Sequence, residues 1–447
     1  MENSGKKRSI DLADVVGKQL RASLFPGAHV VLALSGGVDS VTLLDILARI
    51  ASAIGISVRA VHVNHGISPN ADAWADSCAR ICASLGIRLV IERADLRPWR
   101  AMGLEGAARA ARYGILQRHA ADALLLAHHR DDQSETLMVQ LLRGAGAAGL
   151  AAMPVVRVGS VMTIRPLLGV SRREIDAYAR KSGLEWVEDE SNLDLSRPRN
   201  FLRNKVLPLL EEQYPGTGAR LARSAEHLGE AAELLDVLAA IDLVLCSQDR
   251  ALSIERLHEL GEPRAKNLIR YWSRGLGFSA MATTALSELW RQVRHARPDA
   301  GPELRVGEAI YRRYRGCLYL DRYQEAPCAG FRRVWNGDNI VILPEFGGVL
   351  RFKPEEGRGL SVDRLRSGVV SVKSRSGGER LQTHPARPNR TVKNLMQEQG
   401  IPSWKRECMP LVFCGESLVS VPGVGDDCSW RALQGEQGVI VSWEPLD

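Results

Sequence analysis

One six-residue segment has the side chains and the backbone freedom needed to bind a phosphorylated ligand; it reads Ser35-Gly36-Gly37-Val38-Asp39-Ser40. Adjacent glycines let the chain turn tightly and bring backbone N–H groups close to an anion. The helix expected after them points its positive end at the same place. No Lys follows the glycines, so this is not a Walker A loop. A carboxylate at Asp39 would repel a phosphate unless Mg²⁺ lay between them, so the segment predicts a phosphate or pyrophosphate site with Mg²⁺. The alternative is a bare strand-to-helix turn, which does not need the carboxylate.

A second segment, His128 to Thr136, is rich in acidic residues and follows another predicted strand. Asp132 and Glu135 are three residues apart, so they share one face of a helix. Two carboxylates there can hold Mg²⁺ or orient an amine nucleophile. They can also simply stabilise the helix N-terminus, a role that we assign mainly to Asp131. His128 and its neighbour His129 either contact phosphate or pack structurally, and the sequence favours neither.

Two further segments carry polar side chains toward the same edge of the predicted sheet. The second predicted strand ends with His62, Asn64 and His65, which can meet a nucleobase or form ordinary hydrogen bonds at a strand end. Arg109 and Arg112 lie three apart on a later helix and can neutralise charge on a transferring nucleotide or grip RNA phosphate. By spacing alone, a solvated basic face explains the two arginines better.

The elements that must position these residues alternate between strand and helix. Nearly continuous apolar runs predict buried strands, and apolar residues at helical spacing follow each of them. Repeated β-then-α units predict a doubly wound parallel sheet, a Rossmann-like α/β fold whose ligands bind beyond the carboxyl ends of the strands. The predicted strands are 29–34, 57–63, 87–91 and 123–127, and the predicted helices are 38–51, 71–85, 104–119 and 131–142.

A chain of 447 residues is too long for one core, so we expect several domains. We predict that residues 1–215 form the α/β domain, completed by a helix after 171 that Ser171 and Glu174 cap. Residues 216–330 are mostly helical by pattern. Residues 331–447 have short β-rich runs with Gly and Pro turns, typical of a small α+β domain.

Charge and composition limit the class of protein. The net charge is +7, and residues 350–410 alone carry 13 Lys and Arg against 6 Asp and Glu. This local excess favours a polyanion such as nucleic acid, although a solvated basic face is the alternative. The eight cysteines form no CxxC pair and no zinc-ligand spacing, which favours reduced thiols. No apolar run approaches a membrane span and no secretory signal is evident, so we expect a cytoplasmic protein that does not bind membranes.

Taken together, the ordered segments resemble the tRNA(Ile)-lysidine synthase family of PP-loop ATP pyrophosphatases. The resemblance covers nearly the full chain, and the ordered combination is far more specific than the glycine loop alone. One departure is Arg197, which stands where the family often has an aromatic residue. The matching segments are SGGVDS at 35–40, VNHG at 63–66, AARAARY at 107–113, HHRDDQSET at 128–136, RGAGAAGL at 143–150, 186–192, RNFLR at 199–203, 296–300, 312–316, 393–398 and 401–404.

The resemblance implies a two-step reaction on the wobble cytidine of tRNA(Ile) with a CAU anticodon. ATP would adenylate the C2 carbonyl oxygen and release pyrophosphate; the ε-amine of free L-lysine would then attack C2 and expel AMP. The product pairs with A rather than G and changes the tRNA's identity from methionine to isoleucine. The implied ATP-binding residues are Ser35, Gly36, Gly37, Val38, Asp39, Ser40, His62, Asn64 and His65.

The same resemblance gives catalytic and RNA-binding roles. Asp39 and Asp132 would hold Mg²⁺, and Glu135 would help to position the lysine amine. Arg109 and Arg112 would stabilise charge on the α-phosphate. A homodimer is left open. The predicted tRNA contacts are Arg199, Arg203, Arg387, Arg390, Lys393, Lys405 and Arg406.

Two other functions share some of these sequence features. Another PP-loop tRNA-modifying enzyme, such as a thiolase, would be expected to show catalytic or cluster-binding cysteines near the fold, and none is suitably paired. A catalytically silent tRNA-binding module would not need Asp39, Asp132 and Glu135, because binding alone does not require a metal-competent site.

Overall fold

The computed structural model describes residues 11–295, 303–323, 327–328 and 330–445. The chain divides into two compact units, Met1–Val237 and Leu238–Asp447, and each is described by itself. The segment 296–300, part of the sequence resemblance, lies outside the described residues. No helix in the described ranges is long and apolar enough to cross a membrane.

The first unit is built on a six-stranded sheet with the order β3-β2-β1-β4-β6-β5, parallel except for the β5–β6 pair. The chain therefore winds outward from β1 to β3, returns, and continues from β4, which makes the gap between β1 and β4 the topological switch point. The strands are β1 (His29–Ala33), β2 (Ser57–Asn64), β3 (Arg88–Arg93), β4 (Ala123–Leu125), β5 (Val156–Arg157) and β6 (Met162–Ile164).

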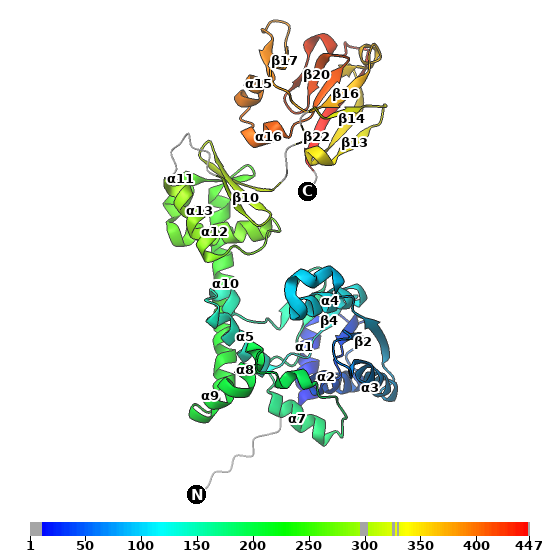
Figure 1. Ribbon diagram of the computed structural model, residues 1–447, viewed down its shortest axis with the longest axis vertical. Helices are drawn as coiled ribbons and strands as arrows, with labels where there is room; N and C mark the ends of the chain where they lie inside the picture. The colour runs from blue at the N-terminus through cyan, green and yellow to red at the C-terminus, as the bar shows by residue number, and fades with distance from the viewer. Residues whose placement is uncertain (1–10, 296–302, 324–326, 329, 446–447) are drawn as a thin grey trace. The chain divides into compact units, whose positions relative to one another are not determined.

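Helices cover both faces of this sheet (Figure 1). Alternate residues of β1 point to opposite faces: Val30 and Leu32 enter the larger core, and Val31 enters the smaller one. The doubly wound fold is therefore confirmed. The larger core is covered by α1 (Leu12–Ser23), α2 (Val38–Ile50), α3 (Ala71–Ser84) and α7 (Arg172–Lys181), and the smaller by α4 (Gly103–His119).

Further helices and helical turns complete the first unit. Ser171 caps α7, and Glu174 forms the reciprocal half of the capping box, as predicted. The other elements are α5 (Arg130–Leu142), α6 (Ala147–Leu150), α8 (Pro198–Phe201), α9 (Leu207–Gln213), the 3₁₀ turns η1 (Arg97–Met102) and η2 (Glu190–Leu193), and η3 (Leu202–Val206), one π-helical turn.

The helix α10 (Thr217–Cys246) runs through the division between the units, so that division lies within the predicted helical segment rather than at its start. In the second unit the predicted helices are joined by an antiparallel sheet of order β7-β8-β11-β10-β9, which the sequence pattern did not indicate. The elements are α11 (Ile254–Leu260), α12 (Glu262–Gly275), α13 (Thr283–His295), β7 (Ser247–Gln248), β8 (Ala251–Ser253), β9 (Glu303–Val306), β10 (Ala309–Tyr314) and β11 (Cys317–Arg322).

The remainder of the second unit has mainly antiparallel strands, with short helices between them, in agreement with the predicted α+β domain. Two sheets, β12-β16-β19-β20-β21 and β13-β14-β22-β15, enclose a common apolar core. The elements are β12 (Arg332–Val334), β13 (Ile340–Leu343), η4 (Pro344–Phe346), β14 (Gly348–Glu356), β15 (Leu360–Ser361), α14 (Val362–Leu365), β16 (Val370–Lys373), β17 (Arg380–Leu381), β18 (Arg390–Thr391), α15 (Val392–Glu398), α16 (Ser403–Glu407), β19 (Leu411–Cys414), β20 (Ser417–Val421), β21 (Gly425–Asp426), η5 (Cys428–Trp430) and β22 (Gln437–Pro445).

Candidate active site

The glycine loop joins β1 to α2 and has a backbone that only glycine allows at one position. Gly36 has a φ of +88°, and a Cβ there would lie 2.9 Å from Val187 Cγ2 and 3.1 Å from Cys78 Sγ. The Val187 N–H also donates to the Gly36 carbonyl at 3.0 Å. Val187 and helix α3 therefore pack against the loop at Gly36, while the N-terminus of α2 faces the switch point.

The two loop serines organise the loop itself. Ser40 is buried, its hydroxyl donates to the Gly37 carbonyl at 3.0 Å, and it accepts the Ser35 N–H at 3.2 Å. Ser35 Oγ accepts the Gly37 N–H at 3.3 Å. These bonds fix a tight turn, and the Ser40 hydroxyl would have to exchange one of them to contact a phosphate.

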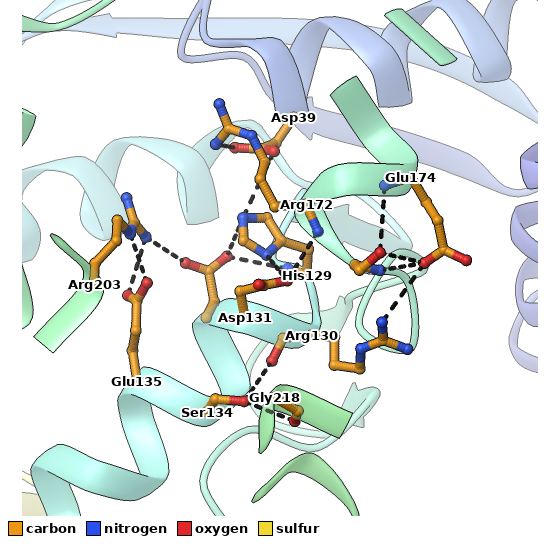
Figure 2. A network of polar contacts seen from close by, with 12 residues as sticks. Asp39, His129, Arg130, Asp131, Ser134, Glu135, Arg172, Glu174, Arg203 and Gly218 are labelled. Atoms are coloured by element: carbon orange, nitrogen blue, oxygen red, sulfur yellow. Dashed lines mark hydrogen bonds and ion pairs between the residues drawn. The ribbon is translucent and has the colours of Figure 1, made fainter. Parts of the chain in front are cut away.

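Acidic side chains converge on His129 at the start of α5 (Figure 2). His129 Nε2 lies 3.6 Å from Asp39 Oδ1 and 3.4 Å from Asp132 Oδ2, and the His129 ring is almost fully buried. Arg172, at the first turn of α7, lies 3.2 Å from the other Asp39 oxygen. The N-terminal turns of α2, α5 and α7 thus meet at the switch point, where their dipoles favour negative charge.

The protonation behaviour of the two aspartates differs. Burial raises the pKa of Asp39, against the opposing effect of His129 and Arg172. Burial acts in the same direction on Asp132, but the neighbouring His129 and His128 outweigh it and lower the Asp132 pKa. The two carboxylates are close enough to repel each other, so a cation between them would relieve that repulsion.

The capping assignment at α5 is corrected by the structure. Asp132, rather than Asp131, accepts the His129 N–H, at 3.0 Å. Asp131 instead accepts the backbone N–H of Arg172 at 2.8 Å, and so links α5 to α7. The reason is local geometry: the third residue of a helix reaches back to the cap, whereas the second points sideways.

Glu135 is 1% exposed and is held by two arginines from the segment 199–203. Arg203 donates to Glu135 Oε2 and to Asp132 Oδ1, each at 3.0 Å, and Arg199 Nε lies 3.5 Å from Glu135 Oε2. Burial raises the Glu135 pKa, although Arg203 opposes the effect. Arg199 and Arg203, predicted as tRNA contacts, therefore lie against the predicted catalytic carboxylates.

A basic region lies beside these acids. Arg109 is exposed and Arg112 is half-buried, and their guanidinium carbons lie 5.1 Å and 5.8 Å from the centre of the Tyr113 ring. Burial lowers the pKa of Arg112. Burial, with Arg112 nearby, also lowers the pKa of His65 to about 4, so this imidazole is neutral at neutral pH.

The other two polar residues at the end of β2 have structural partners. His62 Nδ1 lies 2.9 Å from the Leu34 carbonyl, directly before the glycine loop. Asn64 donates to Asp72 at 2.7 Å and accepts the Gly66 N–H at 2.8 Å. Both side chains are buried and shape the edge of the site, which leaves the backbone here as the surface available to a nucleotide base.

The site fits a phosphate-bound Mg²⁺ better than a metal held by protein alone. In the described ranges no three His, Cys, Asp or Glu side chains are arranged to hold a metal ion. Asp39 Oδ1 is nevertheless buried, and no described residue donates a hydrogen bond to it. Mg²⁺ is usually held by one or two carboxylates together with substrate phosphates and water, which is what Asp39 and Asp132 offer.

Comparisons with known proteins cover the chain from end to end. Residues 11–210 match the PP-loop domain, residues 252–319 the TilS substrate binding domain, and residues 370–443 the TilS substrate C-terminal domain. A tRNA(Ile)-lysidine synthase from Nitrosomonas europaea is 41% identical over 449 residues, covering 100% of this chain and 98% of that relative. The chain belongs to the tRNA(Ile)-lysidine synthase family. The Azoarcus sp. (strain BH72) member is 39% identical over 98% of this chain and 96% of its own length.

Among solved structures, a U34-tRNA thiolase from Methanococcus maripaludis with its [4Fe-4S] cluster is 23% identical. It covers 49% of this chain and 78% of its own, with a TM-score of 0.42.

Two arginines at this edge of the sheet were not singled out from the sequence. Arg172 contacts Asp39 from the start of α7, and Arg165, only 6% exposed, follows the end of β6. The available signal was positional: Arg165 follows an apolar strand run, and Arg172 follows the capping serine of a predicted helix, so both lie at the edge where ligands bind.

The residues of the second unit that we predicted to contact RNA differ in their exposure and in the contacts that they make within the protein. Arg387 and Lys393 are exposed. Arg390 forms a two-point ion pair with Glu398. Lys405 Nζ lies 3.7 Å from Asp321, and Arg406 donates to the Ile401 carbonyl and the Tyr314 hydroxyl, so both would have to exchange these contacts to bind phosphate.

Proposed function

We propose that this protein is the ATP-dependent ligase that joins free L-lysine to C2 of the wobble cytidine in the CAU anticodon of tRNA(Ile), forming lysidine. The observation that carries the proposal is membership of the lysidine synthase family over the whole chain, with all three family domains matched. The convergence of the glycine loop with Asp39 and Asp132 at the switch point supports an active catalytic site.

The chemistry explains why two charged regions are needed. A carbonyl oxygen at C2 is a poor leaving group, so adenylation of that oxygen, with loss of pyrophosphate, prepares C2 for attack by an amine that expels AMP. The backbone of Gly36 and Gly37 is suited to the polyphosphate. Arg112, with Arg109 beside it, is suited to charge that develops on the α-phosphate.

The acidic side of the site is suited to the amine. Glu135 would receive a cationic lysine and help to position its ε-amino group, in exchange for part of its contact with Arg203. The amine must lose a proton before it attacks. Asp39 and Asp132 would hold Mg²⁺, which would neutralise phosphate charge there.

The thiolase alternative finds little support in the cysteines nearest the loop. Cys78 packs behind Gly36, and burial raises its thiol pKa to about 12. Burial also raises the Cys82 thiol pKa, to about 11. Neither is a thiolate at neutral pH, which is the form that thiol chemistry and cluster binding require.

The test uses purified protein, ATP, Mg²⁺, radiolabelled lysine and an unmodified tRNA(Ile) transcript with a CAU anticodon. Label should enter the RNA only when ATP and the wobble cytidine are both present. Asp39→Asn should abolish pyrophosphate release and leave tRNA affinity unchanged. Hydrolysis of ATP to AMP and pyrophosphate without labelled RNA would refute lysidine synthesis and favour another PP-loop reaction. Binding of tRNA without any pyrophosphate release would favour the silent module.

The tRNA-binding surface is proposed to include the exposed Arg387 and Lys393. Phosphate contacts of this kind position RNA without reading its sequence, so recognition of the anticodon loop should instead use its splayed bases and its shape. A cytoplasmic location suits a substrate of this kind.

A further inference from the structure

Two segments of the sequence resemblance lie against each other in the second unit. Residues 312–316 end β10 and form the turn to β11, and residues 401–404 form the start of α16 and the turn before it. Arg312 is paired with Tyr319 across the hairpin and is two residues from Tyr314. Residues that are opposite each other or two apart share a face of a sheet, so these three side chains lie on one face. The other face packs on the apolar core of α11 to α13.

Trp404, on α16, packs against the face of the hairpin that is turned away from that core. Its ring centre lies 5.9 Å from that of Tyr314 and 5.6 Å from that of Tyr319, and both contacts are edge-on. The guanidinium carbon of Arg312 lies 5.1 Å from the centre of the indole ring, and the indole N–H donates to Asp321 Oδ2 at 3.1 Å. Aromatic, cation–π and hydrogen-bond contacts thus fix both the position and the orientation of the ring. We call these five residues the Trp404 interface.

The two residues after Trp404 extend this interface. Arg406 donates to the Tyr314 hydroxyl at 3.1 Å, and Lys405 Nζ lies 3.7 Å from Asp321 Oδ1. Both positive charges are therefore used within the protein, on the same hairpin that Trp404 contacts.

A second contact fixes the neighbouring helix α15. Arg315, in the turn of the hairpin, donates to the Gln397 carbonyl at 2.8 Å, in the last turn of α15. A cation at this end of a helix satisfies a free carbonyl and complements the helix dipole. The exposed Lys393 lies on α15, and the exposed Arg387 precedes it. The contact therefore sets where these two proposed tRNA-binding residues lie relative to the hairpin.

The interface joins parts of the chain that match different family domains. Most of the hairpin lies in the substrate binding domain, residues 252–319, and α15 and α16 lie in the C-terminal domain, residues 370–443. Among the described residues, the apolar cores of these domains are separate clusters, one with Leu318 and the other with Leu350. Domains without a common core are expected to move relative to each other unless a surface contact holds them.

We propose that Trp404 is a positioning residue for tRNA binding: it holds α15 and α16 on the β10–β11 hairpin, so that the two domains bind one RNA as a single body. Two linked binding surfaces gain affinity from each other only when their spacing matches the ligand. A fixed interface also removes the cost of ordering the domains during binding. Trp404 thus acts through Arg387 and Lys393, whereas Lys405 and Arg406 hold the interface. The proposal rests on the proposed function in taking tRNA as the ligand.

The experiment measures the affinity of the intact protein for an unmodified tRNA(Ile) transcript, together with hydrogen exchange of peptides from 309–322 and 392–407. Trp404→Ala should weaken the tRNA Kd by about 10- to 100-fold and speed exchange in both peptides, while peptides from β14 and β22 keep wild-type exchange. Trp404→Phe keeps an aromatic ring but loses the N–H, and it should give an intermediate Kd. Ser403→Ala changes an exposed residue of the same helix and should alter neither measurement.

A double-mutant comparison separates positioning from plain stabilisation. Arg387→Ala should weaken tRNA binding in the wild-type background and clearly less in the Trp404→Ala background, because a loosened C-terminal domain no longer engages the RNA together with the substrate binding domain. Pyrophosphate release at saturating tRNA should keep its kcat in Trp404→Ala, and only the KM for tRNA should rise.

Three results would overturn the proposal. The first is additive effects of Trp404→Ala and Arg387→Ala, and the second is an unchanged tRNA Kd despite faster exchange at the interface. The third is a weaker Kd with unchanged exchange, which would show that Trp404 contacts RNA directly. If Trp404→Ala does not fold, Tyr319→Leu loosens the interface from the hairpin side and should show the same non-additivity with Arg387→Ala. Failure of the wild type to form lysidine, with these binding results intact, would overturn the proposed function alone.

Discussion

Gly36 and Gly37 are adjacent and look equivalent in the sequence, but the structure predicts different responses to alanine. At Gly36 an alanine must adopt a φ of +88°, which costs roughly 1–2 kcal/mol for an L-residue. Its Cβ would also lie 2.9 Å from Val187 and 3.1 Å from Cys78, an overpacking that costs ~1–3 kcal/mol. Gly36→Ala should therefore destabilise the first unit by about 2–5 kcal/mol.

Gly37 is the matched control. It has a φ of −71°, and its added Cβ would meet only Ser35 Oγ, at an ordinary contact distance of 3.5 Å. Gly37→Ala should therefore change stability by less than about 1 kcal/mol. If the backbone at 37 faces the phosphates, the added methyl group should still weaken ATP binding, so the two variants separate folding from ligand approach.

The assay is thermal unfolding of the intact protein, together with hydrogen exchange of peptides from 29–50 and a separate titration with ATP. A loss of 2–5 kcal/mol corresponds to roughly 4–20 °C in a unit of this size. Gly36→Ala/Val187→Ala should regain the part of the loss that comes from the clash and not the part that comes from φ. Equal melting temperatures for Gly36→Ala and Gly37→Ala would refute the reasoning.

Three further outcomes follow from the charges. Arg203→Met should destabilise the first unit by about 3 kcal/mol, because it breaks an ion pair with the buried Glu135. In urea unfolding, the double variant Arg203→Met/Glu135→Gln should recover part of the lost stability. No recovery would contradict the pairing. Arg387→Ala should reduce the slope of the logarithm of tRNA affinity against the logarithm of salt concentration by about 1. Arg390→Ala should have a smaller effect, because Arg390 is already paired with Glu398. An unchanged slope in Arg387→Ala would exclude Arg387 from the interface. His65 has a pKa of about 4 in the folded protein, below its value of about 6.5 in the unfolded chain, so the unfolded chain binds more protons between these pH values. The free energy of unfolding should therefore fall as the pH decreases from 6.5 to 4, and His65→Gln should flatten that dependence. An identical pH profile for His65→Gln and the wild type would contradict the lowered pKa of His65.

The parallel sheet of the first unit could be predicted from sequence because each buried strand is a short apolar run. Val30, Val31 and Leu32 form a continuous apolar run, since alternate residues enter the two cores on opposite faces of the sheet. The five-stranded sheet of the second unit was missed for the opposite reason. Its strand β10 ends in Arg312, Arg313 and Tyr314, whose polar pattern does not separate an exposed strand from a helix.

Only those residues of the candidate site that lie within short sequence motifs could be predicted. The glycine loop and the acidic segment each contain their own chemistry, so Asp39 and Asp132 could be proposed from sequence, and the structure places both beside His129. Arg172 could not be, because its contact with Asp39 spans 133 residues and depends on where α7 is placed. The same limit applies to Lys405: its basic neighbourhood suggested RNA, but it forms an ion pair with Asp321, which is 84 positions earlier in the sequence.

At the switch point, arginines form ion pairs with the acidic residues that we predict to be catalytic. Arg172 holds Asp39, and Arg203 holds both Asp132 and Glu135. Each pair keeps a buried carboxylate compensated before substrates arrive, and each can be exchanged for a substrate charge at little net cost, because one ionic contact replaces another. A site built this way would bind charged substrates by exchanging ionic contacts rather than by creating new buried charge.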